Sequence, residues 1–168
     1  MTASVSDKTS QYVTFRLGEE IFALSVTRVL EVLDVMPLTK VPQSAPFMCG
    51  VINVRGNVVP VVDLRLKFGL TPEEKTLTTR IMVVEFCMDG AMAVTGALAD
   101  AVLDVMEIPE ASIEPPPRVG TGRGIEYISG IARLGEAFIM ILDIDRVFSE
   151  DGEPAAQIAD TEAEAADQ

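Results

Sequence analysis

The chain contains no histidine and no tryptophan, and only two of its 168 residues are cysteine. Without histidine it lacks the commonest general base, the usual zinc ligand and the partner that activates a serine or cysteine nucleophile. Cys49 and Cys87 lie in apolar stretches without a neighbouring cysteine, which favours buried free thiols over a disulfide or a metal site. The sequence therefore favours a protein of a reducing compartment that uses no cofactor, no metal and none of the common catalytic arrangements.

Positive charge and long apolar runs are also scarce. Thirteen Lys and Arg against 26 Asp and Glu give a formal net charge of −13, which argues against a nucleic-acid partner, because such binding depends on clustered basic residues. No apolar run approaches the roughly 18 residues that a membrane-spanning helix needs, and no basic segment followed by an apolar stretch opens the sequence. We therefore expect a cytoplasmic protein with no membrane insertion and no export.

The acidic residues are concentrated at the C-terminal end. From Glu150 onward the sequence has many acids, no Lys or Arg and hardly any large apolar side chain. Such a segment cannot bury enough apolar surface to offset the entropy of ordering the chain. We expect residues 1–10 to be disordered and residues 151–168 to form a disordered acidic tail, which either aids solubility or attracts a basic partner. The folded domain is expected over residues 11–150.

This domain has the pattern of a β protein with an internal repeat. Hairpins are predicted over residues 12–24 and 80–98, and the pentapeptide Val-Leu-Asp-Val-Met follows each of them, at 32–36 and at 102–106. Each half then has a glycine-bounded hairpin that leads to Asp-Leu or Asp-Ile, where a short helix is expected. The repeat predicts two similar β lobes, from related halves of roughly 11–70 and 79–148.

Two features keep a catalytic or ligand-binding alternative open. Asp63 and Asp143 each follow a buried-looking strand, where capping a helix explains them better than paired acid–base catalysis. The run from Gly120 to Gly124 is glycine-rich, but it leads into a strand and lacks the Lys-Ser/Thr ending of a phosphate-binding loop. A small hydrolase or ligand-binding barrel would be supported by a deep polar pocket that holds one of these aspartates and a second carboxylate.

An arginine in a predicted turn favours recognition of another protein. Arg55 lies between two apolar strands and next to Gly56-Asn57, which tolerate positive φ angles, so its guanidinium is expected at the tip of a hairpin. An ordinary solvated turn arginine is an equal alternative.

A second such feature is apolar. Val26, Val29 and Val32 are spaced three apart, with Glu31 beside them, just where a short helical turn should pass into a strand. Valines in this setting usually belong to the core. If they line the seam between the two lobes, they can instead hold one face of a partner helix.

Several segments together resemble the CheW family of chemotaxis coupling proteins over roughly residues 11–150. They are Gly50-Val-Ile-Asn-Val-Arg-Gly56, its continuation Val58-Val-Pro-Val-Val-Asp-Leu-Arg65, then Leu98-Ala-Asp-Ala-Val102, Glu126-Tyr-Ile-Ser-Gly130 and Leu142-Asp-Ile144. The resemblance implies two SH3-like β barrels of about five strands each on a shared core, with short helices and no catalytic activity.

The resemblance also implies a role and its sites. The role is a scaffold at membrane-associated receptor arrays, between the cytoplasmic tip of methyl-accepting chemoreceptors and the regulatory domain of the histidine kinase CheA; a pathway other than motility is the alternative. The receptor groove between the lobes would fall on Val26, Val29 and Val32, with Glu31 nearby and Ala99 from the second lobe. The signalling hairpin would be Arg55 with the flanking Gly50 and Gly56. No residue is assigned to the kinase-facing surface.

Overall fold

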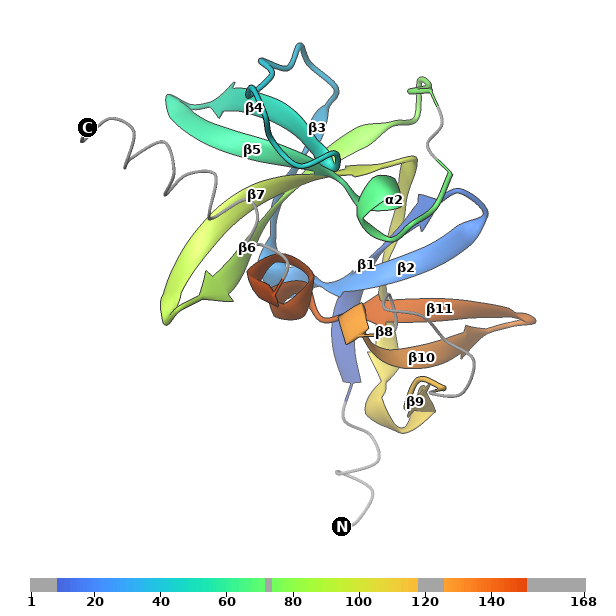
Figure 1. The fold of residues 1–168 in the computed structure, drawn as a ribbon. Helices are drawn as coiled ribbons and strands as arrows, with labels where there is room; N and C mark the ends of the chain where they lie inside the picture. Colours follow the sequence, from blue (N-terminus) through green and yellow to red (C-terminus); the bar gives the residue numbers. More distant parts are fainter. Residues whose placement is uncertain (1–8, 72–73, 118–125, 151–168) are drawn as a thin grey trace.

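The structure is a computed structural model that describes residues 9–71, 74–117 and 126–150. Over these residues the fold is mainly β, with two curled sheets that form two lobes (Figure 1). The first strand, β1(Thr9–Leu17), includes the last two residues of the segment 1–10 for which disorder was expected. The rest of that segment, the glycine-rich run at 120–124 and the acidic tail 151–168 lie outside the described residues.

Lobe 1 is built on a five-stranded sheet. Its strands, in spatial order, are β3(Val29–Asp34), β6(Arg80–Met88), β7(Ala91–Ala99), β5(Asn57–Asp63) and β4(Met48–Val54). Neighbouring strands are antiparallel except β7 and β5, which are parallel. The lobe has a core of its own, formed by Ile52, Val59, Val61, Ile81, Val83 and Leu98.

Lobe 2 is built on a six-stranded sheet, one strand more than the about five expected. Its strands, in spatial order, are β8(Ala101–Pro109), β1, β2(Glu20–Ser25), β11(Ala137–Leu142), β10(Ile128–Leu134) and β9(Ile113–Glu114). Only β2 and β11 are parallel neighbours. The smaller core of this lobe consists of Ala23, Ile108, Ala132, Ile139 and Ile141.

The lobes do not coincide with the two halves of the sequence. Hairpin β1–β2, from the first half, belongs to lobe 2, where it pairs with β8 and β11. Hairpin β6–β7, from the second half, belongs to lobe 1, where it pairs with β3 and β5. The expectation that the halves 11–70 and 79–148 would each form a lobe is corrected accordingly: the halves exchange their first hairpins.

The two halves of the sequence nevertheless have matching local structure around Gly50 and Gly130. Gly50 and Gly130 each follow a register shift in their strand. Beside each glycine, a further segment of the same half pairs with the strand. Thr39 forms an isolated bridge to the residue after Gly50, and Glu114 of β9 pairs with the residue after Gly130. The two halves therefore share local architecture while their hairpins are exchanged.

The largest core lies between the lobes, as the resemblance to the coupling proteins implied. Aromatic rings run through it in a chain, with centroids 5.9 Å apart for Phe15 and Phe22, and 5.7 Å apart for Phe22 and Phe68. This shared core takes residues from both sheets and from the closing π-helical segment η4(Arg146–Glu150); its members include Leu17, Leu24, Val62, Met82, Val84, Phe86, Ala97, Leu142 and Val147. Burial on this scale holds the lobes together as one body.

The two short helices expected after the Asp-Leu and Asp-Ile motifs begin where the sequence predicts them. Asp63 caps α2(Leu64–Lys67), because its carboxylate accepts a hydrogen bond from the backbone N–H of Arg65 at 3.0 Å. Asp143 likewise accepts from the N–H of Arg146 at 3.3 Å. Capping rather than catalysis accounts for the placement of both aspartates.

Candidate interaction site

Strand β3 carries three of the predicted groove residues, and a bulge decides which way they face. The register shifts between Val29 and Glu31, so that Val29 lies opposite Val84 and Val32 lies opposite Met82. Paired residues on adjacent strands face the same side of a sheet, and both partners belong to the shared core. Val29 and Val32 therefore face the shared core, whereas Glu31 faces the other side. Val29 packs against the shared core, and Val32 is 41% exposed.

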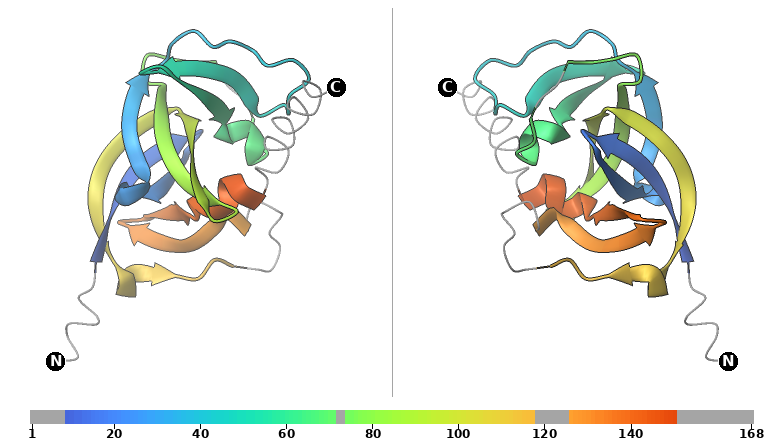
Figure 2. Two further views of the ribbon diagram at one scale, coloured as in Figure 1. Left: turned by 90° about the vertical axis from the view of Figure 1, so that its left-hand side faces the viewer. Right: turned by 90° about the vertical axis from the view of Figure 1, so that its right-hand side faces the viewer.

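Strand β8 provides the matching positions from lobe 2. Val102 lies opposite Phe15 and packs against the shared core, while Val105 lies opposite Val13 and is 56% exposed. In both views of Figure 2, β3 and β8 lie along the same side of the molecule. The shared core thus reaches the surface between two edge strands. We call this region the lobe seam and define it by Val29, Val32, Val102 and Val105.

Ala99 is not on the lobe seam. It lies on β7, in lobe 1 rather than in lobe 2, and only 1% of it is exposed, because the shared core encloses it. Val102, three residues farther on, occupies the surface position expected for Ala99. The repeat contained the signal for it, since Val102 opens the second copy of the pentapeptide that begins at Val32. Val26 lies in the 3-10 helix η1(Val26–Arg28), half-buried, directly before β3.

Arg55 stands at a hairpin tip, as predicted, and the structure adds its partner. Arg55 and Gly56 form the two-residue turn between β4 and β5 with φ angles of 51° and 87°, while Asn57 already belongs to β5. The guanidinium donates two hydrogen bonds to Glu31, with Nη1–Oε2 at 2.6 Å and Nη2–Oε1 at 3.0 Å. The side chain of Arg55 is 76% exposed and that of Glu31 is 20% exposed. This pair joins the hairpin tip to the edge strand β3.

Gly50 serves packing rather than the hairpin tip. It is buried at the opposite end of β4 from Arg55, with a φ of 147°. A Cβ atom at this position would stand 2.6 Å from the carbonyl oxygen of Thr39. Only glycine permits this close approach of two backbone segments.

Two sets of charged residues anchor the lobes to each other. Arg28 of η1 and Asp145 form a bidentate ion pair with both N–O distances at 2.8 Å, and Asp145 also accepts from the N–H of Cys87 at 2.7 Å. Hydrogen bonding to Arg28 lowers the pKa of Asp145, although burial acts in the raising direction. The same hydrogen bonding raises the pKa of Arg28.

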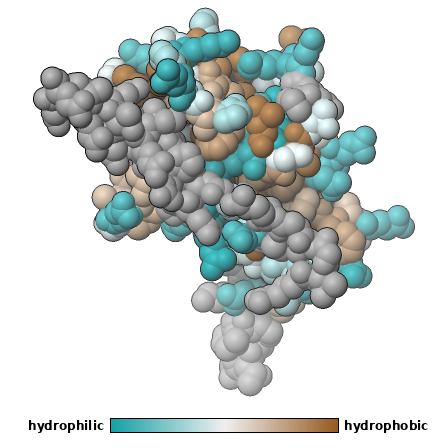
Figure 3. Space-filling view, in the orientation of Figure 1, coloured by the Kyte–Doolittle hydropathy of each residue, from teal (hydrophilic) through white to brown (hydrophobic). Residues whose placement is uncertain are grey.

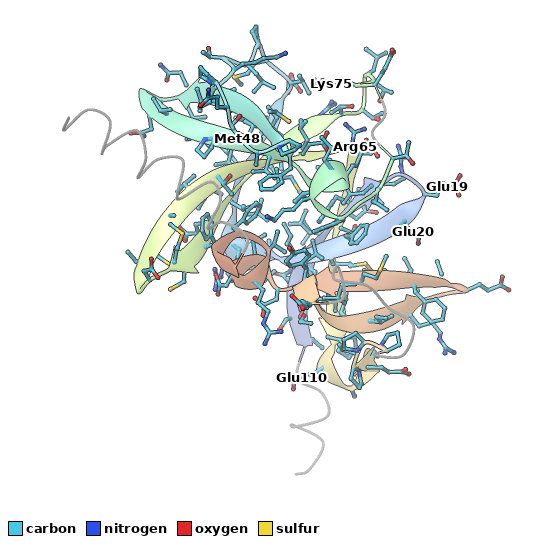
Figure 4. The ribbon with its side chains drawn as sticks, viewed as in Figure 1. Glu19, Glu20, Met48, Arg65, Lys75 and Glu110 are labelled. Carbon is cyan, nitrogen blue, oxygen red and sulfur yellow. The ribbon has the colours of Figure 1, made fainter. Side chains whose placement is uncertain are left out.

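The second set is enclosed. Arg65 donates to Asp100 at 3.0 Å and to the two carboxylate oxygens of Asp63 at 3.1 and 3.2 Å. Asp100 accepts in addition from the N–H of Gly18 in the turn of hairpin β1–β2. The side chains of Arg65, Asp63 and Asp100 are 5%, 8% and 10% exposed. Figure 4 places Arg65 at α2, toward the hairpin end that carries Glu19.

The surface hollows offer little support for the hydrolase alternative. A cleft of about 250 Å³ holds Asp143 and Asp145. Arg28 is hydrogen-bonded to the carboxylate of Asp145 and lowers the pKa of that group, whereas a carboxyl group that acts as a general acid needs a raised pKa. A second hollow of about 170 Å³ is mostly apolar and lies where Figure 3 shows hydrophobic surface near α2; its lining includes Phe22, Phe68 and Leu70. Asp63 is buried against Arg65 and lines neither hollow.

Both cysteines are free thiols and are half-buried. Burial raises the pKa of the Cys49 thiol to about 11, so it is protonated at neutral pH. Within the described ranges, no cluster of three or more acidic, cysteine or histidine side chains could hold a metal ion. Nor does any helix among the same residues have the length and apolarity that a membrane span requires.

The fold and the seam define a two-lobed β domain whose distinctive surface is an apolar line between edge strands. The CheW-like domain family matches residues 11–152. Chemotaxis protein CheW of Bacillus subtilis is 31% identical over 157 residues, which cover 93% of this chain and 97% of that protein. The crystal structure of the scaffolding protein TtCheW from Thermoanaerobacter tengcongensis superposes with a TM-score of 0.75 and 36% identity, covering 84% of this chain and 88% of that one. This chain belongs to the CheW-like domain family.

Proposed function

We propose that this chain is a non-catalytic chemotaxis scaffold that couples methyl-accepting chemoreceptors to the histidine kinase CheA in cytoplasmic, membrane-associated arrays. The observation that carries the proposal is family membership over nearly the whole described fold. A coupler must contact receptor and kinase in ways that depend on receptor state, because otherwise no signal passes. A body with two lobes and a seam between them offers separate surfaces for two partners.

The receptor surface is proposed at the lobe seam. Val32 and Val105 expose apolar side chains beside the shared core, and a partner helix laid along the seam would remove both from water. Val29 and Val102 form the floor, since they are packed against the core below. This assignment replaces the enclosed Ala99 with Val102. Glu31, on the other face of β3, belongs with Arg55 rather than with the seam.

Placing a charge on the seam tests the receptor site. Val32→Asp is expected to weaken binding of a purified receptor signalling fragment at least tenfold, because docking would then bury an unpaired carboxylate. Val94→Asp is the matched control, since Val94 is 39% exposed and faces away from the seam. Calorimetric titration measures both. Equal binding by wild type and Val32→Asp, or an equal loss in both variants, contradicts the receptor site.

The hairpin pair is proposed to act in kinase control. Arg55→Ala should reduce receptor-stimulated kinase activity in a reconstituted array while changing stability by less than about 1 kcal/mol, because the side chain of Arg55 is 76% exposed. Glu31→Gln should give the same defect. Arg133→Ala is the control, since Arg133 lies on the counterpart hairpin and stands over the ring of Phe138 at 5.5 Å. Unchanged kinase control in both Arg55→Ala and Glu31→Gln would refute the assignment.

A further inference from the structure

The chain passes between the lobes at two places, and each leads directly into a wall of the lobe seam. It leaves lobe 2 after β2, runs through η1 and enters β3 at Val29, the residue after Arg28. It returns from lobe 1 at Asp100, the single residue between β7 and β8, two positions before Val102. The positions of Arg28 and Asp100 therefore set where the two walls begin.

Each of these crossover residues forms a carboxylate–guanidinium ion pair with a residue from the opposite half of the sequence. Arg28, in the first half, is bound by Asp145, which is 117 positions away. Asp100, in the second half, is bound by Arg65, which is 35 positions away. The Arg28–Asp145 pair joins η1 to the C-terminal helical segment. Asp145 also accepts a hydrogen bond from the N–H of Cys87, which connects the pair to β6.

One member of each pair occupies an equivalent position in the internal repeat, with the charge reversed. Arg65 is the third residue of Asp63-Leu64-Arg65, and Asp145 is the third residue of the equivalent Asp143-Ile144-Asp145. Each of these third residues binds the crossover of the other half. The first half thus supplies both arginines, Arg28 and Arg65, and the second half supplies both aspartates. Arg65 and Asp145 thus hold an equivalent position with opposite charge, and each binds a residue at which the chain crosses between the lobes, which indicates a shared role in joining the halves.

We propose that these two ion pairs are positioning elements for partner docking: Arg28–Asp145 holds β3, Asp100–Arg65 holds β8, and together they set the spacing of the lobe seam. This inference rests on the proposed receptor site. Of the two pairs, Arg28–Asp145 is the adjustable one, because its side chains are 28% and 34% exposed whereas those of Arg65 and Asp100 are 5% and 10% exposed. Arg28 can be replaced without leaving an unpaired charge buried in the core, because Asp145 is partly exposed to solvent.

The spacing is measured first, without any partner. Spin labels at Asp34→Cys on β3 and Glu107→Cys on β8 occupy exposed positions, and Cys49 and Cys87 are replaced by alanine in this background. Arg28→Gln is expected to shift or broaden the distance distribution between the labels. The charge-swapped double variant Arg28→Asp/Asp145→Arg should restore it. Arg133→Gln is the control and should leave the distribution as in wild type.

Docking is measured next, on unlabelled full-length protein. Arg28→Gln should weaken binding of the receptor fragment at least fivefold and leave binding of the kinase regulatory domain unchanged; the charge-swapped double variant should recover most of the loss. Arg28→Lys keeps the charge but not the bidentate contact, so its affinity for the receptor fragment should lie between those of wild type and Arg28→Gln. This variant also tests the inference if Arg28→Gln does not fold. A wild-type label distance in Arg28→Gln, or a shifted distance with unchanged receptor affinity, overturns the inference. If the wild type itself does not bind the receptor fragment, the proposed receptor site fails, and with it the inference that the pairs position partner docking.

Discussion

Arg65→Ala should lower the free energy of unfolding by about 3–5 kcal/mol, the range expected when one partner of a buried ion pair is removed. The guanidinium is the positive partner that Asp63 and Asp100 share, and their side chains are 8% and 10% exposed. Its removal takes this counterion from two enclosed carboxylates at the point where α2 meets β7 and hairpin β1–β2. Both lobes should be affected, because Asp100 also binds the N–H of Gly18.

Urea-induced unfolding, followed by circular dichroism, measures the effect. Arg80→Ala is the matched control, since Arg80 pairs with Asp34 at 3.5 Å and the side chain of Asp34 is 91% exposed. The control should lie within about 1 kcal/mol of wild type. A destabilisation of Arg65→Ala no larger than that of Arg80→Ala would show that the buried network does not hold the lobes together.

Gly50→Ala should destabilise lobe 1 by about 2–5 kcal/mol, from a strained backbone angle and a steric overlap together. The new Cβ would meet the carbonyl oxygen and carbon of Thr39 at 2.6 and 3.0 Å, and a backbone segment cannot turn away as a flexible side chain can. The two hydrogen bonds between Thr39 and Val51, at 3.0 and 2.8 Å, should be lost in consequence.

Hydrogen exchange at the amides of Thr39 and Val51 reports this loss directly, and thermal unfolding reports the overall stability. Gly56→Ala separates the two causes, because Gly56 has a positive φ of 87° but a methyl group there would meet no atom within 4 Å. It should cost only about 1–2 kcal/mol. Similar exchange and stability in the two variants would rule out the close approach as the reason for glycine at position 50.

Local turn chemistry explains how much of the site is visible in the sequence. Arg55 is predictable at a hairpin tip because a two-residue turn with glycine between alternating apolar residues has few other conformations. The helix caps at Asp63 and Asp143 follow from side chains that reach only two or three residues along the chain. The partner of Arg55 is not visible in this way, since Glu31 lies 24 positions away.

The seam shows the limit of such reasoning. A spacing of three predicts that Val29 and Val32 share a side as they would on a helix, and they do share a side, but the cause is a bulge in β3. The assignment of Ala99 to lobe 2 is wrong because hairpin β6–β7 is exchanged, and no local pattern reveals which sheet a hairpin joins. In the sequence, the only signal that places Val102 on the seam is the repeated pentapeptide, of which Val102 is the first residue in the second copy.

The sequence by itself determined the β class, the repeat, the hairpins, the turn that carries Arg55 and the family resemblance, because each depends on residues that are close along the chain. The tertiary structure decided which lobe receives each hairpin, which valines reach the surface and which arginine meets which aspartate. These outcomes depend on pairing across as many as 117 positions. Such pairing is set by the packing of the shared core between the lobes, which no short segment contains.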